Sequence, residues 1–402
     1  MIATNSKSSN YFLRKLCFLC NNKTKSIITE KLKLYHFGNK KIGYGICNKC
    51  GLVMQTISPS NKELISFYKQ NFYFEDFKKP KKMKIDSINR QIRLIKQESH
   101  KFPKSILEVS LMSIYNLLQF RKEGAKLLHG IEPSLILNNK IKKKHNIKIF
   151  NNIIEKFKSN ISYDLILMSH VLEHLPNPLK AINQCYKNQK LGQKILVEVP
   201  LFDRTELYPP SGLNVEHLYY FDENNLTKLI NKAGYEILVV EKIYQSTQLP
   251  FISILAKKVL KNHYDKKKDI SSYKKQIEQI INYKKTINKI YNRVNKVLKT
   301  IDTSKPSYLF GSGFTASNFI NYTDISSKIK IKGIFDNSKV KENKYLDDLQ
   351  IISPKTINQI GDMNIILTSI GSNESILKQL SNVKAKINFY GFEKNYNFKK
   401  LK

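Results

Sequence analysis

Apolar residues in the centre of the chain gather in short runs that alternate with stretches of helical spacing. The runs predict strands at 105–109, 127–131, 147–150, 163–168 and 194–199, and the stretches between them predict helices at 117–123, 179–186 and 223–233, with a further short helix ending at Phe157. Strand–helix–strand units of this length require right-handed crossovers, so we expect a parallel sheet with helices on both faces. Two further runs, 235–240 and 251–256, are predicted to close the sheet as an antiparallel pair.

A long amphipathic helix is predicted after this sheet. Between Ile270 and Leu298, apolar residues recur at three- and four-residue steps in a lysine-rich background. We expect this helix to link two domains and to have its apolar face covered by one of them.

The last part of the chain repeats the strand and helix pattern on a smaller scale. A strand leads into the turn Gly311-Ser-Gly313, and further strands are predicted at 333–337 and 364–369. The turn could bind a phosphate through its backbone amides, or it could be a tight turn without a ligand. Asp336 ends the next strand, where a ribose contact is expected in a dinucleotide site. The pattern predicts a second, smaller doubly wound domain.

Four of the five cysteines form two Cys-x-x-Cys pairs near the N-terminus. Cys17 and Cys20 are followed, after 26 intervening residues, by Cys47 and Cys50. Each two-residue spacer lets both thiolates approach one ion at about 2.3 Å, and Gly51 relieves the tight turn after the second pair. Four thiolates close the coordination shell of Zn²⁺ and leave no position for a substrate. The spacing therefore predicts a structural zinc ion that stabilises a small domain.

The chain is strongly basic, with 69 Lys and Arg against 32 Asp and Glu and a net charge of +37. This charge favours an acidic partner such as nucleic acid, a nucleotide-linked substrate or an anionic membrane. The lysines are spread along the whole chain, as an AT-rich genome would also produce, so charge alone selects no partner. The first ten residues are polar, and no apolar run approaches the roughly 18 residues of a membrane span. We therefore expect a cytoplasmic protein without a membrane span.

Acidic and imidazole side chains follow the second and fourth predicted strands. Glu132 ends the second strand, where a carboxylate can accept hydrogen bonds from two ribose hydroxyls, although this position also suits a helix cap. The fourth strand leads into Ser169, His170 and His174, followed by Leu-Pro-Asn-Pro. Together these two motifs resemble those of the class I methyltransferases that depend on S-adenosylmethionine.

The order of motifs along the chain narrows this resemblance. From Cys17 to about Phe392, the chain is similar to the sugar C-methyltransferases that act on nucleotide-linked keto-deoxysugars. The motifs that carry the similarity are Cys47-Asn-Lys-Cys50-Gly-Leu-Val53, Glu216-His217-Leu-Tyr-Tyr-Phe221, and Gly311-Ser-Gly313 with Phe335-Asp336-Asn337-Ser-Lys339. The resemblance implies an α/β fold with an N-terminal zinc ribbon (11–56), a helical connection (57–100), a Rossmann-like class I methyltransferase domain (101–262), a linker helix (263–300) and a smaller C-terminal Rossmann-like α/β domain (301–402).

The resemblance also implies roles for individual residues. His217 would take a proton from a substrate carbon next to a ketone, since an imidazole with a pKa near 6.5 suits this task. Glu216 would orient or tune His217, and Asn214 stands where a tyrosine would stabilise an enolate. Alternatively, Glu216 and His217 only cap the turn before the helix at 223–233. The residues expected to bind S-adenosylmethionine are Glu108, Ser110, Ser113, Glu132, Ser169 and His170.

The loop after the first strand departs from the family. Glycines are expected there because the backbone passes close to the cofactor, yet Ser110 and Ile114 stand in their places, and Leu111 and Met112 could fill the pocket. A β-branched Ile does not readily adopt a positive φ. Two hypotheses remain open: a methyltransferase with a reshaped loop, and a non-catalytic relative that binds a nucleotide-sugar or a protein partner. A nucleic-acid methyltransferase is a third hypothesis, disfavoured because the basic residues do not cluster in the ribbon. Which sugar is used and the oligomeric state stay open.

Overall fold

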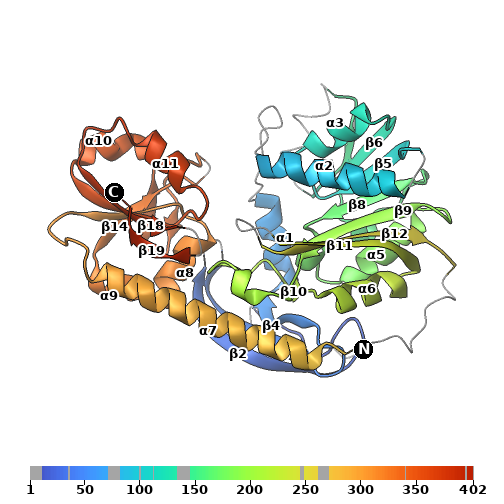
Figure 1. Cartoon of the computed structure of the whole chain (residues 1–402), viewed down its shortest axis with the longest axis horizontal. Coiled ribbons are helices and arrows are strands. Elements are labelled where there is room, and N and C mark those ends of the chain that lie inside the picture. Colours follow the sequence, from blue (N-terminus) through green and yellow to red (C-terminus); the bar gives the residue numbers. More distant parts are fainter. Residues whose placement is uncertain are drawn as a thin grey trace.

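The computed structural model describes most of the chain. The described residues form an N-terminal, a central and a C-terminal sheet (Figure 1). The described residues are 11–34, 37–70, 82–98, 101–111, 113–133, 145–244, 249–260, 271–339, 341–393 and 396–401.

The N-terminal sheet is antiparallel and runs in the order β1-β4-β3-β2. Its strands are β1 (Tyr11–Leu13), β2 (Thr24–Leu34), β3 (Gly38–Cys47) and β4 (Val53–Pro59). The short strand β10 (Tyr219–Tyr220), from a much later part of the chain, pairs with β4 in the register Tyr219 to Met54 and Tyr220 to Val53. The N-terminal sheet therefore reaches the loop that carries Glu216 and His217.

The central sheet runs in the order β11-β12-β9-β8-β5-β6-β7. Strands β5 to β9 are parallel, and β12 lies antiparallel between β9 and β11. The prediction of a parallel sheet closed by an antiparallel pair is confirmed. The strands are β5 (Ser105–Val109), β6 (Leu127–Ile131), β7 (Lys148–Phe150), β8 (Leu165–Ser169), β9 (Lys194–Pro200), β11 (Tyr235–Ile243) and β12 (Phe251–Lys258).

Helices cover both faces of the central sheet, with α2 and α3 on one face and α5 and α6 on the other (Figure 1). Asn177 caps α5 by accepting a hydrogen bond from the Lys180 amide, and Asp222 caps α6 in the same way through the Asn225 amide. The helices that follow the N-terminal sheet and surround the central one are α1 (Asn61–Gln70), α2 (Lys82–Gln97), α3 (Tyr115–Lys122), α5 (Pro178–Lys187) and α6 (Glu223–Lys232).

One predicted helix is shorter than expected. The helix expected to end at Phe157 is only the 3-10 turn η1 (Ile154–Lys156). Asn152 precedes it and accepts a hydrogen bond from the Ile153 amide at 2.8 Å. A side chain that binds the backbone in this way competes with helix formation. Two other 3-10 turns lie near the candidate site, η2 (Leu172–His174) and η3 (Thr205–Leu207).

The long helix α7 (Tyr273–Leu298) runs along the N-terminal sheet toward the C-terminal domain (Figure 1). It contacts β3, η3, α9 and β19, which belong to three different parts of the chain. Its apolar face is buried, so the amphipathic helix predicted between Ile270 and Leu298 is present in the structure. The buried residues on this face include Ile280, Tyr283, Ile287, Ile290, Tyr291, Val294 and Leu298.

The C-terminal domain contains a second parallel sheet in the order β15-β16-β14-β13-β17-β18-β19, with antiparallel strands at both edges. The expected second doubly wound unit is therefore present. Its strands are β13 (Ser307–Phe310), β14 (Ile331–Phe335), β15 (Tyr345–Leu346), β16 (Leu349–Ile352), β17 (Met363–Leu367), β18 (Ile387–Phe392) and β19 (Phe398–Lys400). Its helices are α8 (Phe314–Tyr322), α9 (Ile325–Lys328), α10 (Ile357–Ile360) and α11 (Asn373–Gln379).

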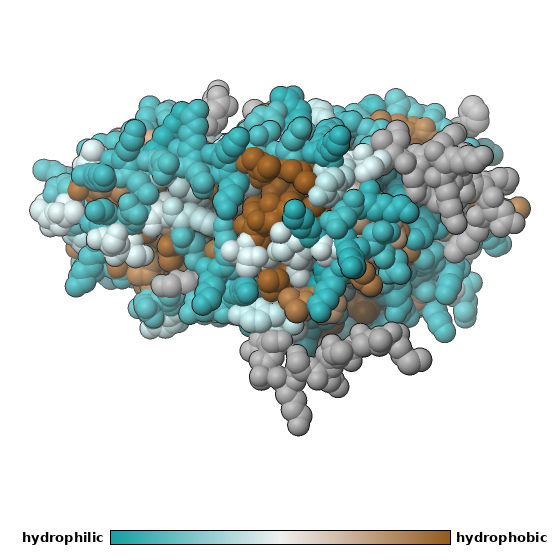
Figure 2. Space-filling model, turned by 90° about the horizontal axis from the view of Figure 1, so that it is seen from below, coloured by the Kyte–Doolittle hydropathy of each residue, from teal (hydrophilic) through white to brown (hydrophobic). Residues whose placement is uncertain are grey.

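The surface is mostly hydrophilic, with an apolar area near the middle of the face seen from below (Figure 2). Among the described helices, none has both the length and the apolar character that crossing a membrane requires.

Candidate functional site

The four cysteines of the N-terminal pairs come together in space. The Sγ atoms of Cys17 and Cys50 are 3.7 Å apart and those of Cys20 and Cys47 are 3.3 Å apart, and all four lie within 4.8 Å of one another. Four thiolates at 2.3 Å from a tetrahedral zinc ion would be about 3.8 Å apart. The donor set and its spacing thus fit a structural Zn²⁺.

The second cysteine pair lies against the start of α7. Gly51 has a φ of +76° and its amide donates a hydrogen bond to the Cys47 carbonyl at 3.0 Å. A Cβ at this position would lie 2.5 Å from the backbone of Ser272. Only glycine fits this turn, as the sequence predicted, and the cysteine cluster is thereby fixed to the linker helix.

In the loop between β5 and α3, Ser110 has the left-handed backbone conformation that glycine usually adopts. Ser110 has a φ of +61°, and its amide donates to the Ile131 carbonyl at 2.8 Å. The Leu111 amide donates to Glu132 Oε2 at 3.0 Å. The carboxylate that ends β6 therefore holds the loop that follows β5.

The bulky side chains of this loop point into the core. Leu111 and Ile114 are fully buried in one apolar cluster with Leu117, and Leu111 packs directly on Gly130. Ile114 has a φ of −84°, so the expectation that this position needs a positive φ is wrong. The Leu111 side chain packs against Gly130 of β6 within this cluster. Met112 lies outside the described residues.

Ser110→Gly is expected to stabilise the protein by about 1 kcal/mol, because a non-glycine residue with a positive φ is strained by roughly this amount. Thermal unfolding of both proteins measures the difference. An unchanged or lower melting temperature would show that the Ser110 side chain contributes more than the backbone strain removes.

Glu108 lies under the loop with one carboxylate oxygen lacking a donor. Asn116 donates to its Oε1 at 2.8 Å, whereas Oε2 is buried without a hydrogen-bond partner among the described residues. Burial raises the pKa of Glu108 to about 7, although Lys84 and the Asn116 hydrogen bond oppose this shift. Ser113 is buried nearby, and its Oγ accepts a hydrogen bond from the Tyr115 amide. The unsatisfied acceptor of Glu108 fits a ligand that brings a cationic donor, such as the ammonium group of S-adenosylmethionine.

Glu108→Gln is expected to remove a pH-dependent loss of stability. A carboxyl with a raised folded-state pKa stabilises the fold below pH 4.5, and this contribution is lost as the pH rises through about 7. The shift corresponds to roughly 3 kcal/mol. Melting temperatures measured from pH 4.5 to pH 8 should fall less in the variant than in the wild type. Parallel curves would contradict the assignment of a raised pKa to this residue.

Glu198, at the end of β9, is fully buried and gathers donors from three elements. It accepts hydrogen bonds from Ser169 at 2.6 Å and from Ser253 at 2.7 Å, from Gln91, and it pairs with Arg90 at 3.3 Å. Burial alone would raise its pKa, but His170, Arg90 and the serine hydroxyls hold the pKa below its usual value. The Ser169 hydroxyl, expected to face the cofactor, is therefore bound to a buried carboxylate.

His170, Glu173 and His174 follow β8 and lie close together. His170 has a φ of +54° and a partly exposed ring, whose Nδ1 is 3.7 Å from Glu173 Oε1. Glu173 is 1 % exposed, and the Nε2 atom of His174 is 3.8 Å from the same oxygen. His174 Nδ1 forms hydrogen bonds with Tyr68 Oη at 3.0 Å and with the Glu216 carbonyl at 3.1 Å.

His217 joins this group from the loop between β9 and α6. Its ring centroid is 4.8 Å from that of His174, and its Nδ1 is buried without a partner among the described residues. Burial lowers the pKa of His217 to about 3, with His174 acting in the same direction and Glu173 opposing it. Burial likewise raises the pKa of Glu216. His217 is therefore neutral at physiological pH.

Asn214 shapes the turn that presents Glu216 and His217. Its Oδ1 accepts hydrogen bonds from the amides of Glu216 and His217 at 3.0 and 2.9 Å. The side-chain carbonyl of Asn214 thus binds backbone. The helix that follows is capped by Asp222, so neither Glu216 nor His217 serves as its cap.

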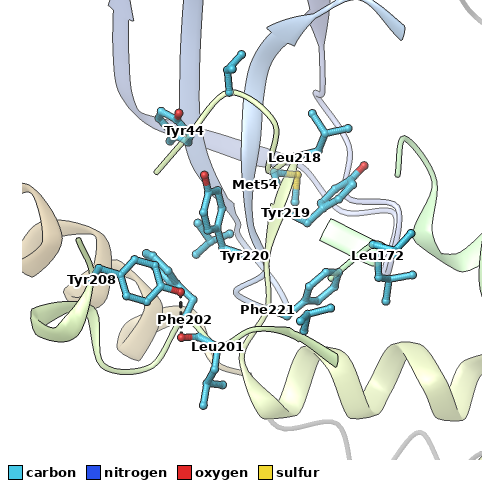
Figure 3. Close-up of a cluster of buried hydrophobic side chains, with 14 of the residues drawn as sticks. Tyr44, Met54, Leu172, Leu201, Phe202, Tyr208, Leu218, Tyr219, Tyr220 and Phe221 are labelled. Atoms are coloured by element: carbon cyan, nitrogen blue, oxygen red, sulfur yellow. Dashed lines mark hydrogen bonds between the residues drawn. The ribbon is translucent and has the colours of Figure 1, made fainter. Parts of the chain in front are cut away.

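Gln55 of β4 holds the same turn from the N-terminal sheet. Its Nε2 donates to the carbonyls of Asn214, Val215 and His217 at 2.9, 3.1 and 2.9 Å, and the residue is fully buried. The ring of Tyr220, which follows this turn, lies 6.1 Å from that of Tyr44 in β3, centroid to centroid (Figure 3). The position of His217 therefore depends on the cysteine-bearing sheet.

A cavity of about 380 Å³ lies between the loop before Asn214 and the glycine turn of the C-terminal domain. Gly311 has a φ of +101°, and the Ser312 amide and hydroxyl both donate to Asp336 Oδ2, at 2.8 and 2.6 Å. Lys341 lies 3.7 Å from the same carboxylate oxygen, and its charge opposes the rise in the pKa of Glu216. The residues that line the cavity include Pro209, Ser211, Gly311, Ser312, Gly313, Thr315, Lys341 and Tyr396.

The central sheet corresponds to a known domain family. Residues 84–240 match the family model described as a methyltransferase domain. This part of the chain is a methyltransferase domain. Numbered within the central sheet, the strands run 3-2-1-4-5-7-6 with the seventh antiparallel, which is the arrangement of class I methyltransferases that use S-adenosylmethionine. The match begins within α2 and ends within β11, so it leaves out β12, the cysteine-bearing sheet and the C-terminal domain.

Two solved structures illustrate the similarity of the methyltransferase domain. The N-methyltransferase NodS from Bradyrhizobium japonicum WM9, in complex with S-adenosyl-L-homocysteine, is 16% identical, with 44% of this chain and 88% of NodS covered and a TM-score of 0.37. The 1,6-didemethyltoxoflavin-N1-methyltransferase from Burkholderia thailandensis is 10% identical, with 55% and 96% covered and a TM-score of 0.39. No curated protein matches the chain by sequence.

Several residues of the site were not found from the sequence. Tyr68 lies among several aromatic residues after the cysteine pairs and does not stand out from them. Gln55 and Glu198 lie within mostly apolar segments, which indicate buried strands rather than a site. Glu173 lies between the two histidines that follow β8, and that spacing was the available signal.

Proposed function

We propose that the chain is an S-adenosylmethionine-dependent methyltransferase that methylates a carbon of a nucleotide-linked keto-deoxysugar. The observation that carries the proposal is the placement of buried, neutral His217 beside His174 and Glu173, which follow strand β8 of the methyltransferase domain. The choice of a nucleotide-linked sugar as the substrate rests on the sequence resemblance together with the cavity described above.

The cavity suits the phosphate end of the substrate. The Lys341 ammonium lines the cavity and supplies the positive charge that phosphate oxygens require, whereas the Gly311 and Ser312 amides are already bound to the Phe335 carbonyl and to Asp336. The cavity is also lined by Pro209 and Ser211, which belong to the segment that leads into the turn carrying His217. A nucleotide-sugar bound with its phosphates in the cavity would place its sugar toward His217.

His217 is proposed to accept the proton from the carbon next to the ketone. Its neutral ring has a lone pair for this proton, and the nearby Glu173 carboxylate would stabilise the imidazolium that forms. The carbon that keeps the electron pair would be the acceptor of the methyl group, and S-adenosylmethionine, when bound, would supply that group and leave as S-adenosylhomocysteine. Tyr68 and Gln55 act as positioning residues, since they hold His174 and the backbone of the turn.

The cofactor would be bound at the carboxyl ends of β5 and β6. Glu132, the loop at Ser110 and Glu108 are its proposed contacts, and His170 lies at the rim. S-adenosylmethionine, when bound, supplies the methyl group on a sulfonium centre. The alternative of a non-catalytic relative is favoured by one observation, that Glu132 and Ser169 both bind protein groups.

A product assay distinguishes the two possibilities. Purified full-length protein is incubated with isotopically labelled S-adenosylmethionine and a panel of nucleotide-linked keto-deoxysugars, with the same sugars lacking the nucleotide as controls. The proposal predicts label in a carbon-bound methyl group of a nucleotide-linked sugar and little label in the free sugar. Label in no sugar, or equally in both forms, would contradict it.

A further inference from the structure

Glu173 is a buried carboxylate without a hydrogen-bond donor. Neither of its oxygens has a partner within hydrogen-bond distance among the described residues, and the residue is 1 % exposed. The nearest nitrogen atoms, in His170 and His174, are 3.7 and 3.8 Å away. An uncompensated buried charge is costly, so a cation is expected beside this group.

The hydrogen bonds of His174 show which of its nitrogens can bind that cation. A backbone carbonyl only accepts hydrogen bonds, so the contact with the Glu216 carbonyl places the proton on His174 Nδ1. In a neutral ring, Nε2 then carries a lone pair, and this lone pair lies on the side of Glu173. Two acceptors that face one another at 3.8 Å leave a place for a positive ion between them.

His217 completes a set of three donors. Its buried Nδ1 has no partner among the described residues, and one ligand atom from each of Glu173, His174 and His217 lies within 4.8 Å of the other two. We propose that these three residues bind a divalent transition-metal ion such as Zn²⁺. Two imidazoles and one carboxylate are a common donor set for such ions and leave open positions.

The geometry needs only a small adjustment. Metal–ligand bonds of about 2.0–2.2 Å place the ligand atoms roughly 3–4 Å apart, so separations of up to 4.8 Å must close by about 1–2 Å. The hydrogen bonds that orient the His174 ring are already formed, because its Nδ1 contacts both Tyr68 Oη and the Glu216 carbonyl. Partners of this kind orient metal-binding histidines in other proteins.

The expected effect of this ion on catalysis rests on the proposed function, in which His217 is the base. A metal ion on His217 occupies the lone pair that would take the substrate proton. Binding at this site is therefore inhibitory, and the form of the protein with zinc only at the cysteines is the active one.

Metal titration of the full-length protein tests the site directly. Co²⁺ and Zn²⁺ serve as probes, since Co²⁺ bound by thiolates gives a sulfur-to-metal charge-transfer band that a His–carboxylate site lacks. The wild type is expected to bind two equivalents, the first with this band and the second without it. Glu173→Gln and His174→Asn should each bind one equivalent, while His170→Ala, a histidine of the same loop outside the donor set, should still bind two.

The outcomes separate the metal site from the proposed function. One equivalent in the wild type would overturn the metal site. Two equivalents in both Glu173→Gln and His174→Asn would also overturn it. The wild-type stoichiometry decides the question even if a variant fails to fold, and His217→Asn provides a third variant. Two equivalents without methyl transfer to any sugar would sustain the metal site and refute only the proposed function.

Discussion

His217→Asn is expected to lower methyl transfer by roughly 10²–10⁴-fold, the usual contribution of a positioned acid or base. Asparagine has no basic lone pair to take the substrate proton. Folding should be affected little, because the Nδ1 atom of His217 has no partner among the described residues and its backbone contacts to Asn214 and Gln55 remain. Initial rates with labelled S-adenosylmethionine and a nucleotide-linked keto-deoxysugar measure the effect.

Cofactor affinity serves as the control for this variant. S-adenosylhomocysteine should bind His217→Asn as it binds the wild type, since the proposed cofactor contacts lie at Glu108, Ser110 and Glu132. Unchanged turnover in His217→Asn would refute the role of this residue as the base. Loss of both turnover and cofactor binding would point to a structural role.

Cys47→Ser is expected to lose the structural zinc ion and much of the stability of the N-terminal sheet. Zinc bound at such a site contributes about 10–16 kcal/mol to the folding of small zinc domains. Because Gln55 lies in the same sheet and binds the turn that carries His217, methyl transfer should fall as well. Metal content and melting temperature measure the first effect, and initial rates measure the second.

Cys185→Ala is the matched control for the zinc site. Cys185 is also buried, but it lies in α5 and contacts Met168 rather than the other cysteines. This variant should keep the wild-type zinc content. An unchanged zinc content and melting temperature in Cys47→Ser would mean that the four cysteines hold no structural ion.

The sequence predicted the sheets because their strands have strong local signals. The buried apolar runs at 105–109 and 194–199 correspond to strands β5 and β9. The cysteine spacing also predicted correctly that the four cysteines cluster, because each Cys-x-x-Cys pair places two thiols close together on one short turn. In contrast, the helix predicted to end at Phe157 is only a 3-10 turn. The Asn152 side chain accepts a hydrogen bond from the Ile153 amide, and this bond competes with helix formation.

The candidate site was harder to predict because its contacts join distant parts of the chain. Gln55 and His217 are far apart in sequence and meet only because β10 pairs with β4. The sequence pointed to Glu216 as the partner of His217, whereas the structure surrounds His217 with His174 and Glu173. The sequence left open whether the loop at Ser110 binds a cofactor, and the structure shows that Ser110 has a positive φ while Ile114 packs into the core.

The central claim is that the carboxyl ends of β5 and β6 hold an adenosyl cofactor despite the absence of glycine from the loop. Calorimetric titration of the full-length protein with S-adenosylhomocysteine tests this claim most directly, with Glu132→Ala as the matched variant. The account predicts saturable binding of one equivalent to the wild type and much weaker binding to the variant. No binding to the wild type at millimolar ligand would contradict the account and leave a methyltransferase fold without its cofactor.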